Sequence, residues 1–410
     1  MENPKIRFKG FTKDWEQRKF SELVTIERGG SPRPIDKFIT NDENGLNWVK
    51  IGDAPEQGNY ITQTAEKIRP EGLSKTREVH PGDLILSNSM SFGRPYIMAI
   101  DGCIHDGWLA IRDTKKNFDL KFLCTLLGTD GMLNQYKAMA AGSTVNNLNK
   151  ELVGGTTVTF PMVEEQIKIG DYFTTLDHLI ALHQRKCEQT KKLKKYMLQK
   201  MFPQNGAKVP EIRFYGFTYD WEQRKVTDLG EIYIGLVTTM TEHYTDKGHL
   251  LIRNSDIKDG YFEFGENPIY LDEEFSERNK LRMHQLGDVI TVHTGDIGTS
   301  AVIGENEVNS IGFATIVTRP NQEILDSNYF ATYLNTDTHK QWAVSMATGD
   351  GRSNYNLKDY TKLVVPIPEI EEQKKIAACI VNLNSLITLH QRKCDELKKM
   401  KKYMLQNMFI

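Results

Sequence analysis

Two blocks of this sequence each occur twice. Residues 4–19 read PKIRFKGFTKDWEQRK and residues 210–225 read PEIRFYGFTYDWEQRK, with 13 of 16 positions identical. Residues 164–202 and 371–409 match at 24 of 39 positions. The segments between the paired blocks are nearly equal in length and mostly unlike in sequence. A duplicated frame with two diverged inserts predicts that the frame binds one kind of partner twice, and that the inserts bind two different targets.

The second duplicated block predicts two long helices. In the C-terminal copy, apolar or small residues recur at alternating intervals of four and three from Ile376 to Leu397, and the central copy repeats this spacing from Ile169 to Thr190. Such a/d spacing is typical of a coiled-coil seam. At about 1.5 Å per residue each helix would be roughly 58 Å long. We expect the two helices to pack as an antiparallel pair with the inserts at opposite ends.

Each insert predicts a mixed α/β domain. Short runs of β-branched and aromatic residues alternate with Gly, Asn and Pro, and a helical stretch follows at 121–140 in the first insert and 327–347 in the second. The expected strands are 47–51, 83–86, 96–100 and 108–112 in the first insert, and 250–253, 288–292, 300–303 and 313–318 in the second.

The predicted fold class is α+β, with two mixed α/β domains joined by two long antiparallel helices in an internal pseudo-twofold repeat. Segments 81–97 and 286–303 align, as do 141–152 and 349–360, so we expect the inserts to share a fold and to differ in surface. The predicted boundaries are 1–160 for the first domain, 161–204 for the central helix, 205–368 for the second domain and 369–410 for the C-terminal helix.

Charge is distributed unevenly along the chain, although the net charge is only −2. Residues 205–368 include 15 basic and 24 acidic residues, a net charge of −9. Phosphate contacts supply most of the non-specific affinity of DNA-binding proteins, so a second domain that binds DNA would need its basic residues on one face. The acidic balance therefore keeps a different hypothesis open, a coiled-coil adaptor whose inserts bind proteins.

Motifs of the common catalytic and cofactor sites are absent. No glycine precedes a lysine, which excludes a phosphate loop, and the chain has no GxGxxG, HExxH or GxSxG. It also lacks two adjacent prolines, and so lacks the (D/N/S)PP(Y/F/W) loop of amino-methyltransferases. His183 and Cys187 are four apart on one helix face, as are His390 and Cys394, but a closed zinc site needs four ligands. We interpret them as seam residues and expect neither a catalytic nor a metal site.

Other features favour a cytoplasmic protein without a membrane partner. No apolar run approaches the roughly 18 residues of a membrane span, and MENPKIRFKG has no signal-peptide core. The 5 cysteines form no CxxC pair, which favours reduced thiols.

Three doubled motifs resemble the DNA-specificity subunit of type I restriction–modification enzymes over the whole chain. They are F-x-G-F-T-x-D-W-E-Q-R-K, the helix start P-x-x-E-E-Q, and L-H-Q-R-K-C-x-x-x-K-K-x-K-K-Y-M-L-Q. The resemblance implies two target-recognition domains, a pair of antiparallel helices and no catalytic site or cofactor in this chain. It implies double-stranded DNA as ligand and two modification subunits as partners, which methylate adenine N6 with S-adenosylmethionine. Restriction subunits, which use ATP and Mg, can join such a complex.

Two copies of one docking surface can hold two copies of a partner about a pseudo-twofold axis. Two different reading domains on that frame would then read two unlike half-sites. We therefore expect a bipartite, asymmetric DNA target, with half-sites about one helical turn (34–36 Å) apart. An orphan or inhibitory reader without an active nuclease remains an alternative.

Base reading needs hydrogen-bonding side chains on loops that a rigid scaffold positions. Three loops of each insert fit this description: 28–37, 87–94 and 142–147 in the first, and 235–244, 292–300 and 349–356 in the second. The candidates of the first insert are Arg33, Lys37, Ser87, Asn88, Ser89, Ser91, Arg94, Ser143, Thr144, Asn146 and Asn147. Those of the second are Thr238, Thr239, His293, Thr294, Thr299, Arg352, Ser353 and Asn354. The alternative for each is a turn residue that satisfies its own backbone.

Overall fold

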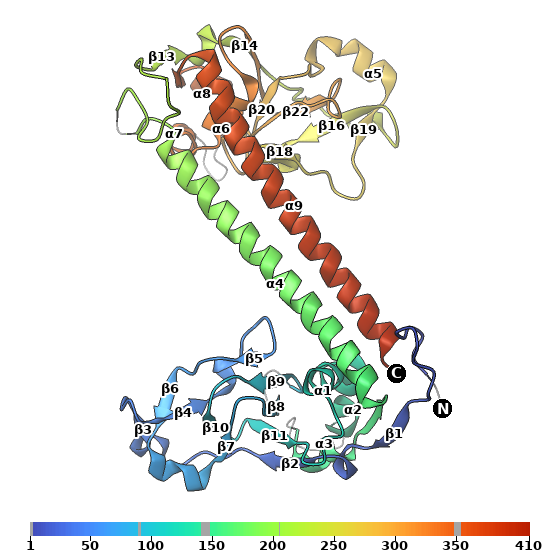
Figure 1. The fold of residues 1–410 in the computed structure, drawn as a ribbon. Coiled ribbons are helices and arrows are strands. Elements are labelled where there is room, and N and C mark those ends of the chain that lie inside the picture. The colour runs from blue at the N-terminus through green and yellow to red at the C-terminus, as the bar shows by residue number, and fades with distance from the viewer. Residues whose placement is uncertain (1–2, 89–91, 141–147, 205, 348–353) are drawn as a thin grey trace. The chain divides into compact units, whose positions relative to one another are not determined.

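The computed structural model describes the chain except for residues 1–2, 89–91, 141–147, 205 and 348–353 (Figure 1). The chain forms two compact units. Unit 1 consists of residues 1–185 and 391–410, and unit 2 consists of residues 186–390. Both long helices contribute residues to both units, since the unit boundaries fall within α4 (Val163–Lys200) and α9 (Ile370–Met408).

Unit 1 contains two larger sheets and a pair of strands. The central sheet has the order β2-β11-β8-β9-β5, the outer sheet has the order β3-β6-β4-β10-β7, and β1 pairs with β12. The strands are β1 (Glu16–Lys19), β2 (Thr25–Arg28), β3 (Ile39–Thr40), β4 (Leu46–Val49), β5 (Tyr60–Ile61), β6 (Glu66–Ile68), β7 (Arg77–Val79), β8 (Leu84–Ser87), β9 (Pro95–Met98), β10 (Gly102–Ile104), β11 (Trp108–Arg112) and β12 (Thr157–Phe160). The helices besides α4 and α9 are α1 (Leu120–Leu127), α2 (Asp130–Ala140) and α3 (Lys150–Gly155).

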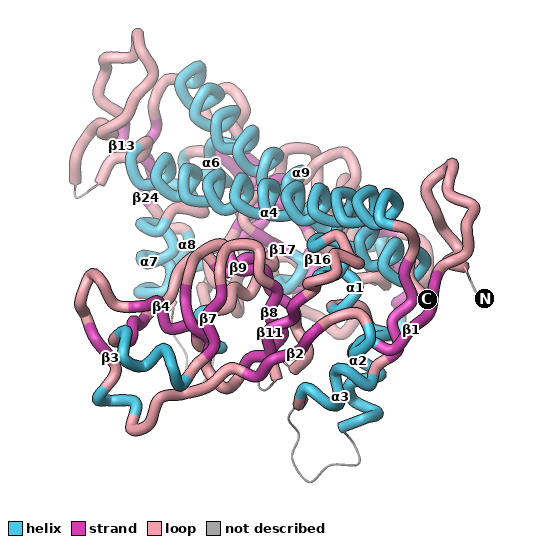
Figure 2. Tube along the Cα trace, turned by 60° about the horizontal axis from the view of Figure 1, so that its bottom comes forward, coloured by secondary structure: helices cyan, strands magenta, loops and turns pink. Residues whose placement is uncertain are grey.

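The central sheet of unit 1 lies between the outer sheet and the layer of α1, α2 and α3 (Figures 1 and 2). Side chains alternate between its two faces, as in any strand. Leu84 and Leu86 of β8 pack in one core with Phe122 of α1, whereas Ile85 packs in another core with Val49 of the outer sheet. Burial on both faces explains why the sequence of β8 is continuously apolar rather than alternating.

Unit 2 repeats this architecture. Its central sheet, β14-β23-β20-β21, matches β2-β11-β8-β9 in order, and β16 and β22 are parallel as β4 and β10 are. The strands are β13 (Glu222–Lys225), β14 (Gly230–Ile234), β15 (Tyr244–Thr245), β16 (His249–Arg253), β17 (Ile257–Lys258), β18 (Tyr261–Phe262), β19 (Tyr270–Leu271), β20 (Val289–Thr291), β21 (Ser300–Val302), β22 (Ile311–Phe313), β23 (Ile316–Pro320) and β24 (Val364–Ile367). The other helices are α5 (Glu273–Arg278), α6 (Ser327–Leu334), α7 (Asp337–Met346) and α8 (Leu357–Tyr360). The prediction that the inserts share a fold is confirmed.

The long helices run antiparallel within each unit. In unit 1, the rings of Phe173 and Phe409 are 5.8 Å apart. The Lys401 ammonium lies 2.5 Å from the Asp177 carboxylate. The contact residue thus moves forward on α4, from 173 to 177, while its partner moves back along the chain, from 409 to 401. In unit 2, the Cys187 thiol lies 3.9 Å from the main-chain oxygen of Ile387. Apolar residues of the predicted seam are buried, among them Ile169, Phe173, Leu176, Ile180, Ile376, Ile380 and Leu397. The heptad prediction is therefore confirmed.

A buried ion pair joins the two duplicated blocks of each unit. The Arg7 guanidinium donates to both carboxylate oxygens of Glu165, at 3.0 and 2.7 Å. Arg213 does the same to Glu372, at 2.7 and 2.8 Å. Both carboxylates are almost entirely buried in the first turn of a long helix. The opening block and the helix block are thus parts of one structural device, which explains why both were duplicated.

Two sequence predictions need correction. The expected strand 313–318 is in fact the end of β22, a turn at Ala314 and the start of β23, because Ala314 has a positive φ of 49° that ends the extended run. The expected helices 121–140 and 327–347 are each two helices. Within 327–347, the second helix is α7. Thr336 is its N-cap, because its side chain accepts a hydrogen bond from the main-chain nitrogen of His339.

The substitution Arg213→Ala should destabilise unit 2 by about 3 kcal/mol, because it leaves the Glu372 carboxylate buried without a partner. Denaturant unfolding monitored by fluorescence would measure the loss. The matched control is Lys225→Ala, since Lys225 is exposed on β13 and its truncation should change the free energy of unfolding by less than about 0.5 kcal/mol. Equal stability of the two variants would contradict the role given to the ion pair.

Unit 2 should lose stability between pH 6.5 and pH 4. Burial lowers the pKa of His284 from 6.5 to about 4, so the folded imidazole stays neutral while the unfolded one takes up a proton. The contribution of His284 is therefore complete above pH 6.5 and is lost as the pH falls, by about 3 kcal/mol at pH 4. Unfolding free energies across this range should fall less steeply for His284→Asn. The exposed His80, replaced by Asn, should leave the steep fall in place.

Candidate nucleic-acid interface

The first two predicted loops of unit 1 meet at one turn, residues 105–107, between β10 and β11. We call it the unit 1 turn. Gly30 of the first loop donates its N–H to the main-chain oxygen just before this turn, at 3.1 Å. Asn88 of the second loop donates its side-chain amide to the main-chain oxygen of Asp106, at 2.8 Å. Leu148, which directly follows the third loop, donates its N–H to the Asn88 oxygen at 3.0 Å. Hydrogen bonds therefore bring loops far apart in sequence to one surface.

Arg33 and Lys37 of the first loop are exposed to solvent. The Arg33 side chain is 81% exposed, and its guanidinium lies 3.8 Å from the Asp106 carboxylate. The Ser31 hydroxyl donates to the same carboxylate at 2.9 Å. Lys37 ends the short helix Ile35–Lys37. Both predicted cations are therefore positioned where a ligand could reach them.

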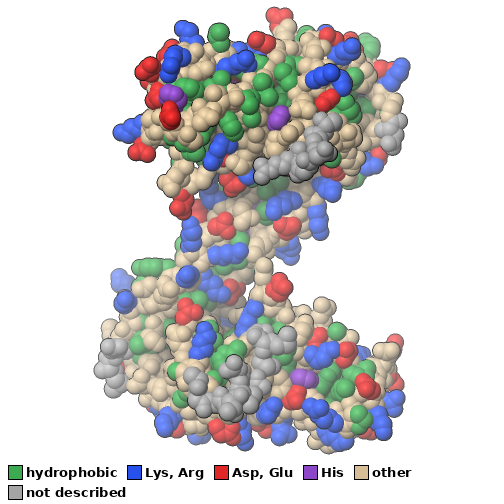
Figure 3. Space-filling model, turned by 180° about the vertical axis from the view of Figure 1, so that it is seen from behind, with side chains coloured by type: hydrophobic (Ala, Val, Ile, Leu, Met, Phe, Trp, Pro, Cys, Tyr) green, Lys and Arg blue, Asp and Glu red, His purple; other side chains and the backbone are tan. Residues whose placement is uncertain are grey.

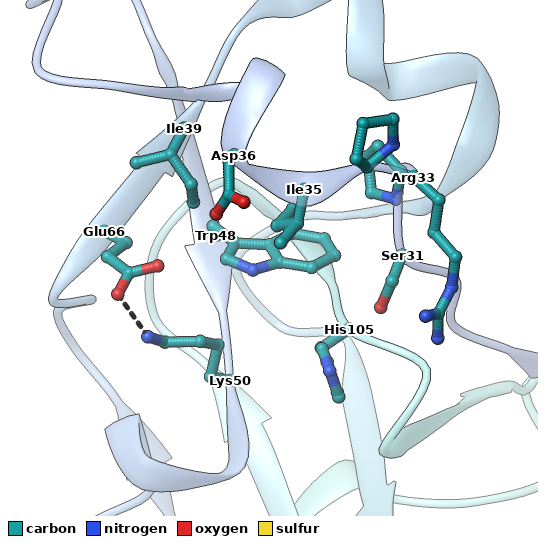
Figure 4. A pocket seen from close by; sticks show the side chains of 11 residues that line it. Ser31, Arg33, Ile35, Asp36, Ile39, Trp48, Lys50, Glu66 and His105 are labelled. Carbon is teal, nitrogen blue, oxygen red and sulfur yellow. Dashed lines mark hydrogen bonds and ion pairs between the residues drawn. The ribbon is translucent and has the colours of Figure 1, made fainter.

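The first loop also borders a hollow of about 1020 Å³ (Figure 4). Trp48 lies beneath it, and Lys50, Glu66 and His105 lie around it beside Arg33. The Lys50 ammonium is 2.5 Å from the Glu66 carboxylate. The hollow combines an apolar floor with donors and acceptors, which is the chemistry that a base edge requires.

The predicted residues of the second loop of unit 1 that the structure describes, Ser87, Asn88 and Arg94, are engaged inside the domain. Ser87 is fully buried, and its hydroxyl oxygen accepts from the Arg94 N–H at 3.0 Å. Asn88 is buried as well, with the amide bond described above. The Arg94 guanidinium donates to the Glu56 and Gly58 oxygens and lies 5.0 Å from the Tyr96 ring centroid. The described geometry gives these three side chains a structural role, and their contact with bases stays a prediction.

Several candidates lie outside the described residues. They are Ser89, Ser91, Ser143, Thr144, Asn146 and Asn147 of the first insert, and Arg352 and Ser353 of the second.

The unit 2 turn, residues 313–314, is the counterpart of the unit 1 turn. Leu236 of the first loop donates its N–H to the oxygen before the turn at 2.8 Å, and accepts from the Ala314 N–H at 2.9 Å. Asn254 links this turn to the second loop. Its side-chain amide donates to the Ala314 oxygen at 3.2 Å, and its side-chain oxygen accepts from the His293 N–H at 2.8 Å. The first and second loops of unit 2 thus meet at this turn as well.

Three predicted residues of unit 2 form one hydrogen-bonded chain. The Thr294 hydroxyl donates to the Asn354 side-chain oxygen at 2.7 Å, and Nδ1 of His293 lies 2.8 Å from that hydroxyl oxygen. Burial lowers the pKa of His293, which favours the neutral ring at pH 7. Because the hydroxyl proton is used by Asn354, Nδ1 carries the imidazole proton and Nε2 is an acceptor. The second and third loops of unit 2 therefore form one hydrogen-bonding surface.

The other candidates of unit 2 divide into exposed and buried residues. Thr238 and Thr239 are exposed on the first loop. Thr299 is fully buried, and its hydroxyl donates to the Asp296 carboxylate at 2.6 Å. The two exposed threonines are therefore better placed for a ligand than Thr299.

Sequence reasoning missed the residues of the two turns and of the strand ends beside them. Lys50, His105 and Asp106 in unit 1, and Asn254 and Phe313 in unit 2, are central to the loop surfaces. The signal that could have found them is their place at or just after the ends of β4, β10, β16 and β22, because parallel neighbours end at one sheet edge.

Basic and acidic side chains are interspersed on the face shown in Figure 3. In unit 2, arginines are engaged in ion pairs inside the domain, such as Arg253 with Asp256 and Arg319 with Asp288, at 2.9 and 2.8 Å. Among the described residues, no group of three or more His, Cys, Asp or Glu side chains could hold a metal ion. None of the described helices has the length and hydropathy needed to cross a membrane.

Comparison with known proteins matches the chain to one family twice. A family model described as the type I restriction modification DNA specificity domain matches residues 12–192 and 219–399. The EcoBI type I restriction enzyme specificity subunit of Escherichia coli is 22% identical over 90% of this chain and 79% of its own length. The MjaVIII specificity subunit of Methanocaldococcus jannaschii is 21% identical, over 95% of this chain and 90% of its own. The crystal structure of the type I restriction–modification S subunit from M. genitalium shares the fold, with a TM-score of 0.64 and 13% identity, over 100% of this chain and 99% of that one.

The substitution Asn88→Ala should lower the free energy of unfolding by about 1 kcal/mol, because it removes the hydrogen bond of a buried side chain to the Asp106 oxygen and leaves only the 3.4 Å contact from Arg28. Thr239→Ala, at an exposed loop position, should change stability by less than about 0.5 kcal/mol. Thermal denaturation of both variants beside the parent protein tests this difference. A destabilised Thr239→Ala with an unaffected Asn88→Ala would reverse the structural roles assigned to the two side chains.

Proposed function

This chain belongs to the family of type I restriction–modification DNA specificity subunits and has two recognition domains, and on that premise we propose that each unit reads one half of a bipartite, asymmetric DNA target. The observation that carries the proposal is the meeting of the first and second loops at one turn in each unit. The frame that positions the loops is the same in both units, while the side chains on the loops differ. Two unlike readers on a repeated frame would recognise two unlike half-sites.

The proposal includes the residues that would touch DNA. Exposed Arg33 and Lys37 of unit 1, and the His293–Thr294–Asn354 chain of unit 2, are the described candidates with the best access or geometry. Arginine and asparagine can each form two hydrogen bonds to a base edge, to guanine and adenine respectively. The candidates in loops outside the described residues stay part of the proposed interface.

We further propose that this chain carries no catalytic residues of its own and docks two copies of an adenine-N6 methyltransferase subunit. S-adenosylmethionine would be bound by those partners, and ATP and Mg by restriction subunits where these join. The repeated exposed apolar residues of the long helices support two equivalent docking sites. Leu193 and Tyr196 are exposed in unit 2, and Met400 and Tyr403 occupy the corresponding positions in unit 1.

Exchange of residues 20–160 for the corresponding insert of another family member should change one half of the methylated motif and leave the other half intact. The physical reason is that each unit has its own core and its own loop surface. Single-molecule methylome sequencing of a host that carries the chimaera and the modification subunits would measure the motif. The control is the same host with the parent chain, whose motif should be split into two unlike halves by a non-specific gap.

Two results would count against the proposal. A chimaera in which both half-sites change would contradict independent readers. Absence of any new motif with the parent chain, in a host where the complex assembles and its methyltransferase is active, would contradict the DNA-reading function itself.

A further inference from the structure

We propose that Phe313 of unit 2 reads a thymine in the second half-site by contact with its C5-methyl group. The inference rests on the proposed function, since it requires that unit 2 reads DNA. It assigns one named side chain to one kind of base.

Phe313 is exposed at the centre of the loop surface. Phe313 is 40% exposed. Full burial of a phenylalanine side chain would stabilise the protein by roughly 1.5–3 kcal/mol, so this exposure forgoes part of that stabilisation. Val237 on the adjoining first loop is 66% exposed, next to Leu236, which pairs with Phe313 in an isolated β-bridge. Thr238 follows directly. Two exposed apolar side chains, Phe313 and Val237, therefore lie on adjoining segments among polar loop residues.

The turn that presents Phe313 is held rigidly. Ala314 has a φ of 49°, in the left-handed region that costs a non-glycine residue roughly 1–2 kcal/mol. Hydrogen bonds to both sides maintain this backbone: the Ala314 N–H donates to Leu236, and the Asn254 amide donates to the Ala314 oxygen. Strain that neighbouring groups enforce is typical of functional sites. The backbone that presents the phenyl ring is thus fixed before any ligand binds.

The chemistry of the major groove identifies the ligand. Each base presents donors and acceptors there, and only thymine adds an apolar group, its C5-methyl. An exposed phenyl ring on a base-reading loop is complementary to that methyl group. In unit 2 the first loop bonds to the oxygen of Gly312, and Phe313 follows. In unit 1 the first loop bonds to the oxygen of Ile104, and His105 and Asp106 follow, so the equivalent turn offers polar groups instead. The two units would therefore read different bases from the same place in the fold.

The test replaces the thymines of the second half-site one at a time by uracil, which lacks only the methyl group. The probe is the assembled complex of the full chain with its modification subunits, bound to duplexes that carry the target determined by methylome sequencing. Uracil at one position should weaken binding of the parent complex about fourfold, as expected for one buried methyl group. With Phe313→Ala the thymine and uracil duplexes should bind equally at that position.

Matched variants separate this inference from the proposed function. Phe313→His, which copies unit 1, should also abolish the uracil effect and gives the answer if Phe313→Ala does not fold. Lys225→Ala, at an exposed position on β13 outside the loops, should leave the effect in the second half-site unchanged. Three results would overturn the inference while DNA reading stands. The first is a uracil effect that persists in both Phe313 variants, and the second is no uracil effect at any position of the parent complex. The third is a second half-site without an A·T pair. Loss of all sequence preference by the parent complex would instead overturn DNA reading.

Discussion

A carboxylate without access to water lies in the first turn of each long helix, and the neutralisation of that charge organises the unit around it. Arg7 binds Glu165 from the opening block of unit 1, and Arg213 binds Glu372 in the same way in unit 2. A buried carboxylate that loses its partner costs several kcal/mol. The arginine and the glutamate are about 160 residues apart in sequence, so the pair closes the whole insert into one unit.

The glutamine that follows each buried glutamate extends this junction. Gln166 donates to the main-chain oxygens of Asn117 and Pro161, and its own oxygen accepts from the Asp119 N–H. Gln373 makes the corresponding bonds in unit 2. The first turn of each long helix thereby fixes the segment before α1 or α6 and the residue after β12 or β24. Because this junction holds the frame, the loops beside the two turns are free to differ between the units.

The parts of the fold that the sequence predicted are those with a regular apolar period or a short continuous apolar run. The seam from Ile169 to Cys187 is periodic, and the expected strand 108–112 coincides with β11, because both lie in a core. The turn at Ala314 was missed, since β-forming residues on both sides conceal it and nothing in a single sequence marks a left-handed alanine.

The candidate site was predictable at the level of loops but not of side chains. A loop of small polar residues marks a candidate binding segment, and the described loops of each unit do meet. Whether a polar residue faces solvent depends on partners that are distant in sequence. Ser87 and Asn88 are buried because the chain returns beside them, with Asp106 supplying the acceptor for Asn88. Only the tertiary structure distinguishes such residues from the exposed Thr239.

The acidic balance of unit 2 gains a structural meaning from its ion pairs. Arg213, Arg253 and Arg319 each bind a carboxylate of the same unit, so these guanidinium groups stabilise the domain rather than a phosphate. Phosphate contacts dominate non-specific affinity, so these three arginines add little sequence-independent attraction to DNA.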